Sequence, residues 1–211
     1  MVNGIEFNEV TRKPDPKRLL NVYDHSASTL NLLRAFSQGG MADLNQVHSW
    51  NSDYVKDTAQ SKKFEQLSEK IEECLKFMAA CGVNSDNTRA LMETEFYTSH
   101  EALLLNYEEA MTRKDTITNA KELFTTSAHM VWIGDRTRQL DGAHVEYMRG
   151  IANPIGIKCG PSLEADELIK LIEVLNPENV SGRLTLITGM GADLVLAKLP
   201  KLLSAVDKSG A

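Results

Sequence analysis

The stretch Met130–Gly160, MVWIGDRTRQLDGAHVEYMRGIANPIGIKCG, decides the fold class. It begins with four apolar residues, 130–133, which end at Gly134. A charged segment, 135–138, follows at once, and a helical pattern lies beyond it. A short apolar run bounded by a glycine is consistent with a buried strand. We therefore expect a strand with charged residues at its carboxyl end.

The same arrangement occurs twice more along the chain. The apolar run 155–157 precedes Lys158 and a helical pattern that begins near Glu164. The run 184–188 ends at Gly189, and another helical pattern follows. Strand, polar tip and helix in tandem predict an α/β fold in which helices cover a parallel sheet.

Ligands of such folds bind beyond the carboxyl ends of the strands. This rule places Asp135, Arg136, Arg138 and Lys158 on one rim of the predicted sheet. Three cations there would suit an anionic substrate, because guanidinium groups bind phosphate or carboxylate bidentately and a lysine adds a point charge. The alternative is that these residues are ordinary solvated loop charges.

The first part of the chain predicts helices. The segment 14–16, Pro-Asp-Pro, is typical of a helix start with Asp15 as the N-cap, and the apolar spacing after it predicts one buried face. A second long helix is expected over about 58–80. Cys74 and Cys81 lie roughly on one face of it, where we expect two core thiols rather than a metal site.

The middle of the chain is less distinctive. Residues 89–92 are interpreted as a strand, and 96–112 as a helix with His100 and Glu101 at its polar start. Residues 116–125 are interpreted as helix or loop. The expected domains are a helical extension or hairpin over 1–83 and a β/α domain over 84–211.

Composition excludes several classes of protein. The 211 residues carry a net charge of −6 with a pI near 5.4, and a general nucleic-acid binder would need a basic face instead. No apolar run approaches the length of a membrane span, and the first residues lack the features of a secretory signal. The three cysteines form no disulfide framework, so a reducing cytoplasm is the expected location.

Three long motifs identify a family. They are WIGDRTRQLDGAHVEYMRGIANPIGIKCGP, EFYTSHEALLLNYEEAMTR upstream of it and LNPENVSGRLTLITGMG downstream. The sequence closely resembles the class II (plant-like) 3-deoxy-D-arabino-heptulosonate 7-phosphate (DAHP) synthases over essentially its whole length. The resemblance implies a (β/α)8 barrel enzyme that condenses phosphoenolpyruvate with erythrose 4-phosphate, the first step of the shikimate pathway to the aromatic amino acids. Because a complete barrel takes about 250 residues, we expect a partial (β/α)8 TIM-type barrel, about half of a complete one, preceded by a helical extension.

The resemblance also assigns roles to residues. Arg136 and Lys158 match residues that hold phosphoenolpyruvate, and Asp135 matches an acid beside that arginine, which is more often glutamate in the family. Arg138 and Gln139 belong to the same motif and are assigned supporting roles. At Gly189 the family has an arginine that also contacts phosphoenolpyruvate.

The family enzyme uses a divalent metal of the Mn or Co type. The resemblance places its ligands before the first and beyond the last residue of this chain, so we assign none here and expect no condensation by this chain alone. One rival hypothesis is a non-catalytic interaction protein built on the half-barrel. Another is a homo-oligomer in which two incomplete barrels close one sheet, because an incomplete barrel has exposed edges.

Overall fold

The computed structural model describes residues 2–46, 59–118 and 121–210. The chain divides into two compact units, residues 1–96 and 97–211. The boundary expected at residues 83 and 84 lies inside the first unit, and the two domains named above stay a prediction.

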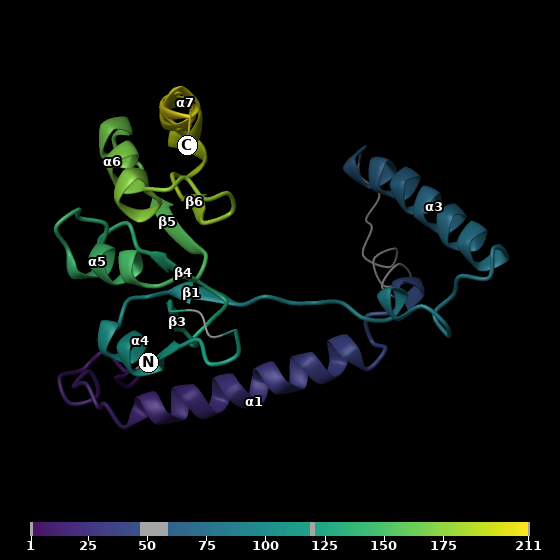
Figure 1. Cartoon of the computed structure of the whole chain (residues 1–211), viewed down its shortest axis with the longest axis horizontal. Coiled ribbons are helices and arrows are strands. Elements are labelled where there is room, and N and C mark those ends of the chain that lie inside the picture. The colour runs from purple at the N-terminus through teal and green to yellow at the C-terminus, as the bar shows by residue number, and fades with distance from the viewer. Residues whose placement is uncertain (1, 47–58, 119–120, 211) are drawn as a thin grey trace. The chain divides into compact units, whose positions relative to one another are not determined.

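The first unit is helical. Helix α1 spans Arg18–Gln38, α3 spans Ala59–Ala80, and a single 3₁₀ turn, η1, spans Arg89–Leu91 (Figure 1). The expected start of the second helix at Thr58 lies outside the described residues. Asp15 is not the N-cap, because that position belongs to Lys17, but the Asp15 carboxylate accepts the Lys17 backbone N–H at 3.0 Å.

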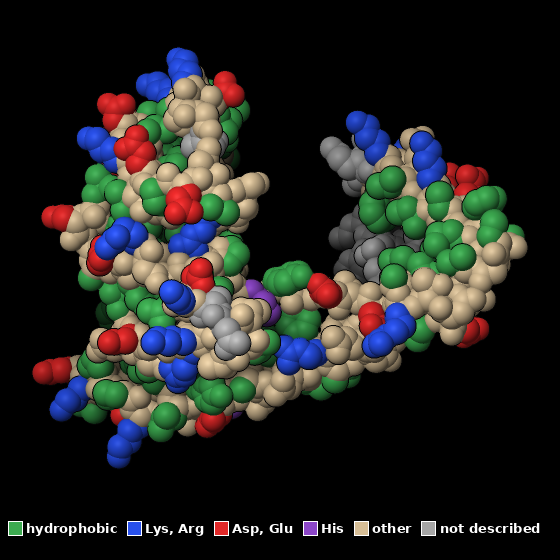
Figure 2. Space-filling model, in the orientation of Figure 1, with side chains coloured by type: hydrophobic (Ala, Val, Ile, Leu, Met, Phe, Trp, Pro, Cys, Tyr) green, Lys and Arg blue, Asp and Glu red, His purple; other side chains and the backbone are tan. Residues whose placement is uncertain are grey.

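The predicted buried face of α1 is wrong, since none of its residues is buried. Four large apolar side chains of α3 are exposed as well, and Figure 2 shows hydrophobic side chains gathered on its surface. They are Phe64, Leu67, Ile71 and Phe77. Cys74 and Cys81 are exposed, so the prediction of two core thiols is also wrong. Among the described residues of this unit, no other element covers these faces. Apolar spacing predicts that a helix has an apolar face, but it does not show whether another element packs on that face.

The strand expected at residues 89–92 is wrong too. These residues form η1, closed by hydrogen bonds from Leu91 N to Thr88 O at 3.0 Å and from Met92 N to Arg89 O at 2.9 Å. Backbone groups that are satisfied within one turn are not available to a strand ladder.

The second unit contains a four-stranded parallel sheet in the order β1-β4-β5-β6. The predicted strands at 130–133 and 184–188 are confirmed, and the one at 155–157 is longer by two residues. The strands are β1 Ser99–Glu101, β4 Met130–Ile133, β5 Ile155–Cys159 and β6 Leu184–Thr188.

Three helices follow these strands in chain order and lie beside the sheet (Figure 1). They are α5 Ala143–Gly150, α6 Ala165–Leu175 and α7 Ala192–Ser209. The mixed α/β fold with a parallel sheet is therefore confirmed.

The prediction of one helix over residues 96–112 is wrong. This segment contains strand β1, helix α4 (Leu105–Met111) and the start of an antiparallel pair, β2 Thr112–Lys114 with β3 Leu123–Thr125. His100 and Glu101 therefore lie on a strand and not at a helix start. Three polar residues form β1 because β4 supplies a parallel partner, with His100 opposite Val131.

The core lies between the sheet and its helices. Alternate residues of β4 and β5 are buried there, as the two-residue period of a strand requires. Helix α6 covers them with a face of the predicted amphipathic type. The core residues of these elements are Val131, Ile133, Ile155, Ile157, Cys159, Leu168, Leu171, Ile172 and Leu175.

Arg183, just before β6, fastens the amino-terminal end of the sheet. Its guanidinium donates to the carbonyl oxygens of Ile151 at 2.6 Å and Met148 at 3.2 Å, and also to that of Asn153. Burial lowers the pKa of Arg183 below its ordinary value. The charge thus satisfies carbonyl groups at the end of α5 that the helix itself leaves without partners.

None of the helices in the described part of the chain combines the length and the hydropathy that a bilayer crossing requires.

Candidate functional site

The charged residues of the central motif lie at the carboxyl ends of two neighbouring strands. Asp135 and Arg136 follow β4, and Lys158 lies near the end of β5, which pairs with β4 through Ile133 and Ile157. Oδ1 of Asp135 accepts the backbone N–H of Gly160 at 3.0 Å, which joins the two strand ends directly. The structure thus brings these residues to one edge of the sheet.

Arg138 is a buried ionic clamp below this edge. Its side chain is 8% exposed, and its Nε donates to Asp135 Oδ1 at 3.1 Å. One Nη donates to Ser162 Oγ at 3.0 Å, and the other forms an ion pair with Glu167 on α6. Burial would lower its pKa, but hydrogen bonds to Glu167 and Asp135 raise the pKa above the ordinary value. The guanidinium is thus committed to protein carboxylates.

Gly160 must be a glycine for this clamp to form. A Cβ at that position would lie 2.5 Å from the carboxyl atoms of Asp135. The backbone of the β5–α6 loop therefore approaches Asp135 more closely than any other residue type would allow.

Arg136 and Lys158 are the cations that remain available. Arg136 is exposed, and its backbone carbonyl accepts Gln139 Nε2 at 3.0 Å, which braces the loop. Among residues 2–46, 59–118 and 121–210, neither Arg136 nor Lys158 forms a salt bridge. Lys158 Nζ lies 4.9 Å from the centroid of the Trp132 ring. The rim therefore offers a guanidinium and an ammonium to an anion.

The sequence model of the class-II DAHP synthetase family matches residues 1–211. The chain belongs to this family. The resemblance read from the three motifs is thereby confirmed.

Curated proteins similar to this DAHP synthetase family member include two bacterial enzymes. A phospho-2-dehydro-3-deoxyheptonate aldolase of Streptomyces coelicolor is 53% identical over 210 residues, which are 100% of this chain and 46% of the relative. The phospho-2-dehydro-3-deoxyheptonate aldolase AroG of Mycolicibacterium smegmatis is 42% identical and is matched over 45% of its length. The chain spans about half the length of the curated relatives it matches.

A metal centre requires several donor side chains that converge on one point. No group of three or more His, Cys, Asp or Glu side chains in ranges 2–46, 59–118 and 121–210 is placed to hold an ion. The donor set of the described residues therefore does not fit a divalent metal ion.

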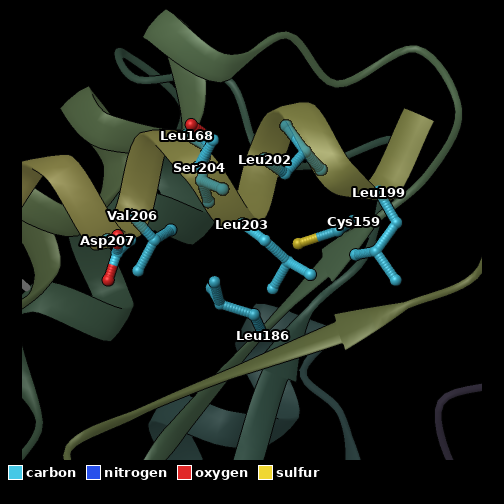
Figure 3. A pocket seen from close by; sticks show the side chains of 9 residues that line it. All are labelled: Cys159, Leu168, Leu186, Leu199, Leu202, Leu203, Ser204, Val206 and Asp207. Atoms are coloured by element: carbon cyan, nitrogen blue, oxygen red, sulfur yellow. The ribbon is translucent and has the colours of Figure 1, made fainter. Parts of the chain in front are cut away.

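A cavity of the second unit lies on the other face of the sheet. It has a volume of about 620 Å³, and Figure 3 shows Leu199 and Leu203 of α7 pointing toward Cys159 and Leu186 on the strands. Because Cys159 and Lys158 are consecutive on β5, they face opposite sides. This apolar cavity therefore lies on the side of the sheet opposite to the Lys158 side chain.

Sequence reasoning missed Glu101 as a residue of the rim. It ends β1, in register with Trp132, and its carboxylate lies against Gly134 at the end of β4. The two residues before it, Ser99 and His100, are polar and give no strand signal, so only the pairing with β4 reveals its position.

A buried carboxylate was missed as well. Glu108 on α4 is 2% exposed and lies 2.6 Å from both His100 Nε2 and Ser127 Oγ, with Thr125 Oγ1 donating at 3.2 Å. Burial raises its pKa, but the hydrogen bonds from these three residues prevail and hold the pKa below the ordinary value. This cluster holds the His100 side chain on one face of β1, and Glu101, the next residue, points to the opposite face.

Proposed function

We propose that this chain forms part of the phosphoenolpyruvate site of a 3-deoxy-7-phosphoheptulonate synthase. The complete enzyme would condense phosphoenolpyruvate with erythrose 4-phosphate. The observation that carries the proposal is the pair of cations, Arg136 and Lys158, at the carboxyl ends of adjacent parallel strands and without carboxylate partners among the described residues. The family membership and the names of the two relatives support the same reaction.

Each rim residue has a role that its surroundings favour. The Arg136 guanidinium is suited to pair with phosphate or carboxylate oxygens bidentately, and Lys158 adds a point charge. Asp135 holds the β5–α6 loop in place through Gly160 and Arg138. Arg138 and Gln139 support the loop after β4: Arg138 through its bonds to Asp135 and Ser162, and Gln139 through its bond to the Arg136 carbonyl. Two fixed cations would neutralise phosphoenolpyruvate and orient its enol for attack on an aldehyde.

The strand order supports a partial (β/α)8 barrel. Strands β1, β4, β5 and β6 follow one another in sequence order without the reversal that marks a doubly wound sheet. We propose that the four strands form part of a TIM-type barrel whose inner face bears Trp132 and Lys158. The partners of the complete enzyme would then be its two substrates, with a divalent metal held by residues outside the described ones.

Calorimetric titration of the purified chain with phosphoenolpyruvate tests this function. Arg136→Ala and Lys158→Ala should each weaken binding by roughly tenfold or more, because each removes a charge-assisted contact. Lys170→Ala is the matched control, since Lys170 is an exposed cation on α6, away from the rim. Equal losses in all three variants would indicate a nonspecific charge effect. A folded chain that binds no phosphoenolpyruvate would favour the interaction protein instead.

A further inference from the structure

Trp132 and Lys158 share the face of the sheet that the helices do not cover. Trp132 lies in register with Gly156 on the neighbouring strand, and Lys158 is two residues beyond Gly156. Residues two apart on a strand point to the same side. The flanking residues Val131, Ile133, Ile157 and Cys159 are in the helix-covered core.

Gly156 makes room for the indole. A Cβ at Gly156 would lie 2.8 Å from Trp132 Cβ and 2.9 Å from Ile187 Cδ1, closer than packed side chains come. With no side chain there, Trp132 and Lys158 meet across the glycine. Lys158 Nζ lies 4.9 Å from the ring centroid, within the range of a cation–π contact.

The buried indole N–H makes tryptophan a less favourable residue at this position than phenylalanine would be, if packing alone mattered. Trp132 Nε1 is buried and has no hydrogen-bond partner in the described part of the chain. A buried donor without a partner costs free energy, and phenylalanine would avoid that cost. What tryptophan offers beyond phenylalanine is the strongest cation-binding face among the side chains.

We propose that Trp132 is a positioning residue that holds the Lys158 ammonium on its ring for an anionic phosphate or carboxylate group. This inference rests on the proposed function. A lysine side chain loses considerable rotamer freedom when it is fixed, and the ring limits that freedom before the ligand arrives. A carboxylate partner would also limit it but would neutralise the charge, whereas an aromatic face leaves the ammonium its full charge for the ligand.

The test measures phosphoenolpyruvate affinity and thermal stability in the full chain. Trp132→Leu should weaken binding by roughly three- to thirtyfold, the range of a cation–π contact. Trp132→Phe keeps an aromatic face and should lose less affinity, while its melting temperature equals or exceeds that of the parent because the unpaired N–H is gone. A merely structural role would instead lower stability and leave the affinity of the folded protein unchanged.

A double-mutant cycle isolates the contact. In a Lys158→Met background, replacing Trp132 with leucine should cause no further loss of affinity, because the ammonium that the ring positions is absent. A spectroscopic reading comes from Trp50→Phe, which leaves Trp132 as the single tryptophan of the two in the sequence. Its fluorescence should change when phosphoenolpyruvate binds and when Lys158 is replaced by methionine.

The outcomes separate this inference from the proposed function. Parent-like affinity in Trp132→Leu, or an equal effect of that change with and without Lys158, would overturn the positioning role while the phosphoenolpyruvate site stands. Absence of binding to the folded parent chain would overturn both.

Discussion

Arg138 donates from Nε to Oδ1 of Asp135 over 3.1 Å, and the same carboxylate oxygen accepts the Gly160 N–H at 3.0 Å. One oxygen therefore connects the loop after β4 to the loop after β5. The other end of Arg138 reaches Glu167 on α6, so the clamp spans three segments. Arg136, two residues from Arg138 in the sequence, remains outside it.

Loss of the clamp should destabilise the second unit. Arg138→Leu removes the partner of two carboxylates and should cost about 2–3 kcal/mol of unfolding free energy. This is less than the roughly 3–5 kcal/mol of a fully buried pair, because the side chains of Asp135 and Glu167 are 38% and 35% exposed. Urea denaturation measures the change.

The control for this prediction is Arg149→Leu. Arg149 forms an exposed pair with Glu146 on α5, and its loss should not change stability measurably. Similar destabilisation in the two variants would contradict the clamp.

Gly189→Arg should strengthen phosphoenolpyruvate binding. The resemblance implies an arginine at this position, and a Cβ at Gly189 would meet no atom within 4 Å. One more charge-assisted hydrogen bond is worth about 1.5–3 kcal/mol, or at least about tenfold in affinity. Calorimetry would show the gain. Gly189→Gln adds a long side chain without charge, and an equal gain in that variant would refute the electrostatic explanation.

The Glu108 cluster should make stability fall in acid. Burial raises the pKa of Glu108, yet hydrogen bonds from His100, Ser127 and Thr125 hold it below the ordinary value of 4.5. A carboxyl whose pKa is lower in the folded state adds stability above its unfolded pKa, and this stability is lost as the pH falls through the folded pKa.

The variant Glu108→Gln tests this pH dependence. The difference in unfolding free energy between the parent and the variant should shrink between about pH 6 and about pH 3. Denaturant titrations across that interval provide the measurement. A difference that stays constant with pH would show that the ionised form is not the stabilising one.

Cysteine alkylation should distinguish Cys159 from Cys74 and Cys81. Burial raises the pKa of the Cys159 thiol to about 11, even though the nearby Arg138 lowers it. At about pH 8 only about one in a thousand such thiols is the reactive thiolate. Iodoacetamide should therefore add two labels to the native protein, at exposed Cys74 and Cys81, and a third only after unfolding. Mass spectrometry counts the labels, and three in the native state would contradict the burial of Cys159.

Strands made mainly of apolar residues could be predicted from the sequence. A strand of polar residues, which forms only because a neighbouring strand pairs with it, could not. The bounds of β4 follow from a continuous apolar run, and those of β6 from a run of leucine, isoleucine and threonine, each ended by glycine. Strand β1, Ser-His-Glu, has no such signal and exists because β4 lies beside it. The same limit explains α1, whose apolar spacing indicates a face but not what covers that face.

The candidate site divides in a similar way. The positions of Asp135, Arg136 and Lys158 at strand ends follow from the apolar runs before them, and their binding roles stay a prediction. The burial of Arg138 could not be foreseen, because a run of charges is usually solvated. Trp132 lies within an apolar run, and nothing in that run separates it from an ordinary core residue.

Arg183 lies at the end of the sheet opposite to the proposed anion site, so its contacts can stabilise the protein without touching that site. It binds carbonyl groups at the amino-terminal end of the strands, while the proposed anion-binding groups lie at the carboxyl ends. Residues around Arg183 can therefore be mutated and the variants selected for thermal stability alone. The affinity for phosphoenolpyruvate should not change, because the length of the sheet separates Arg183 from the proposed anion site.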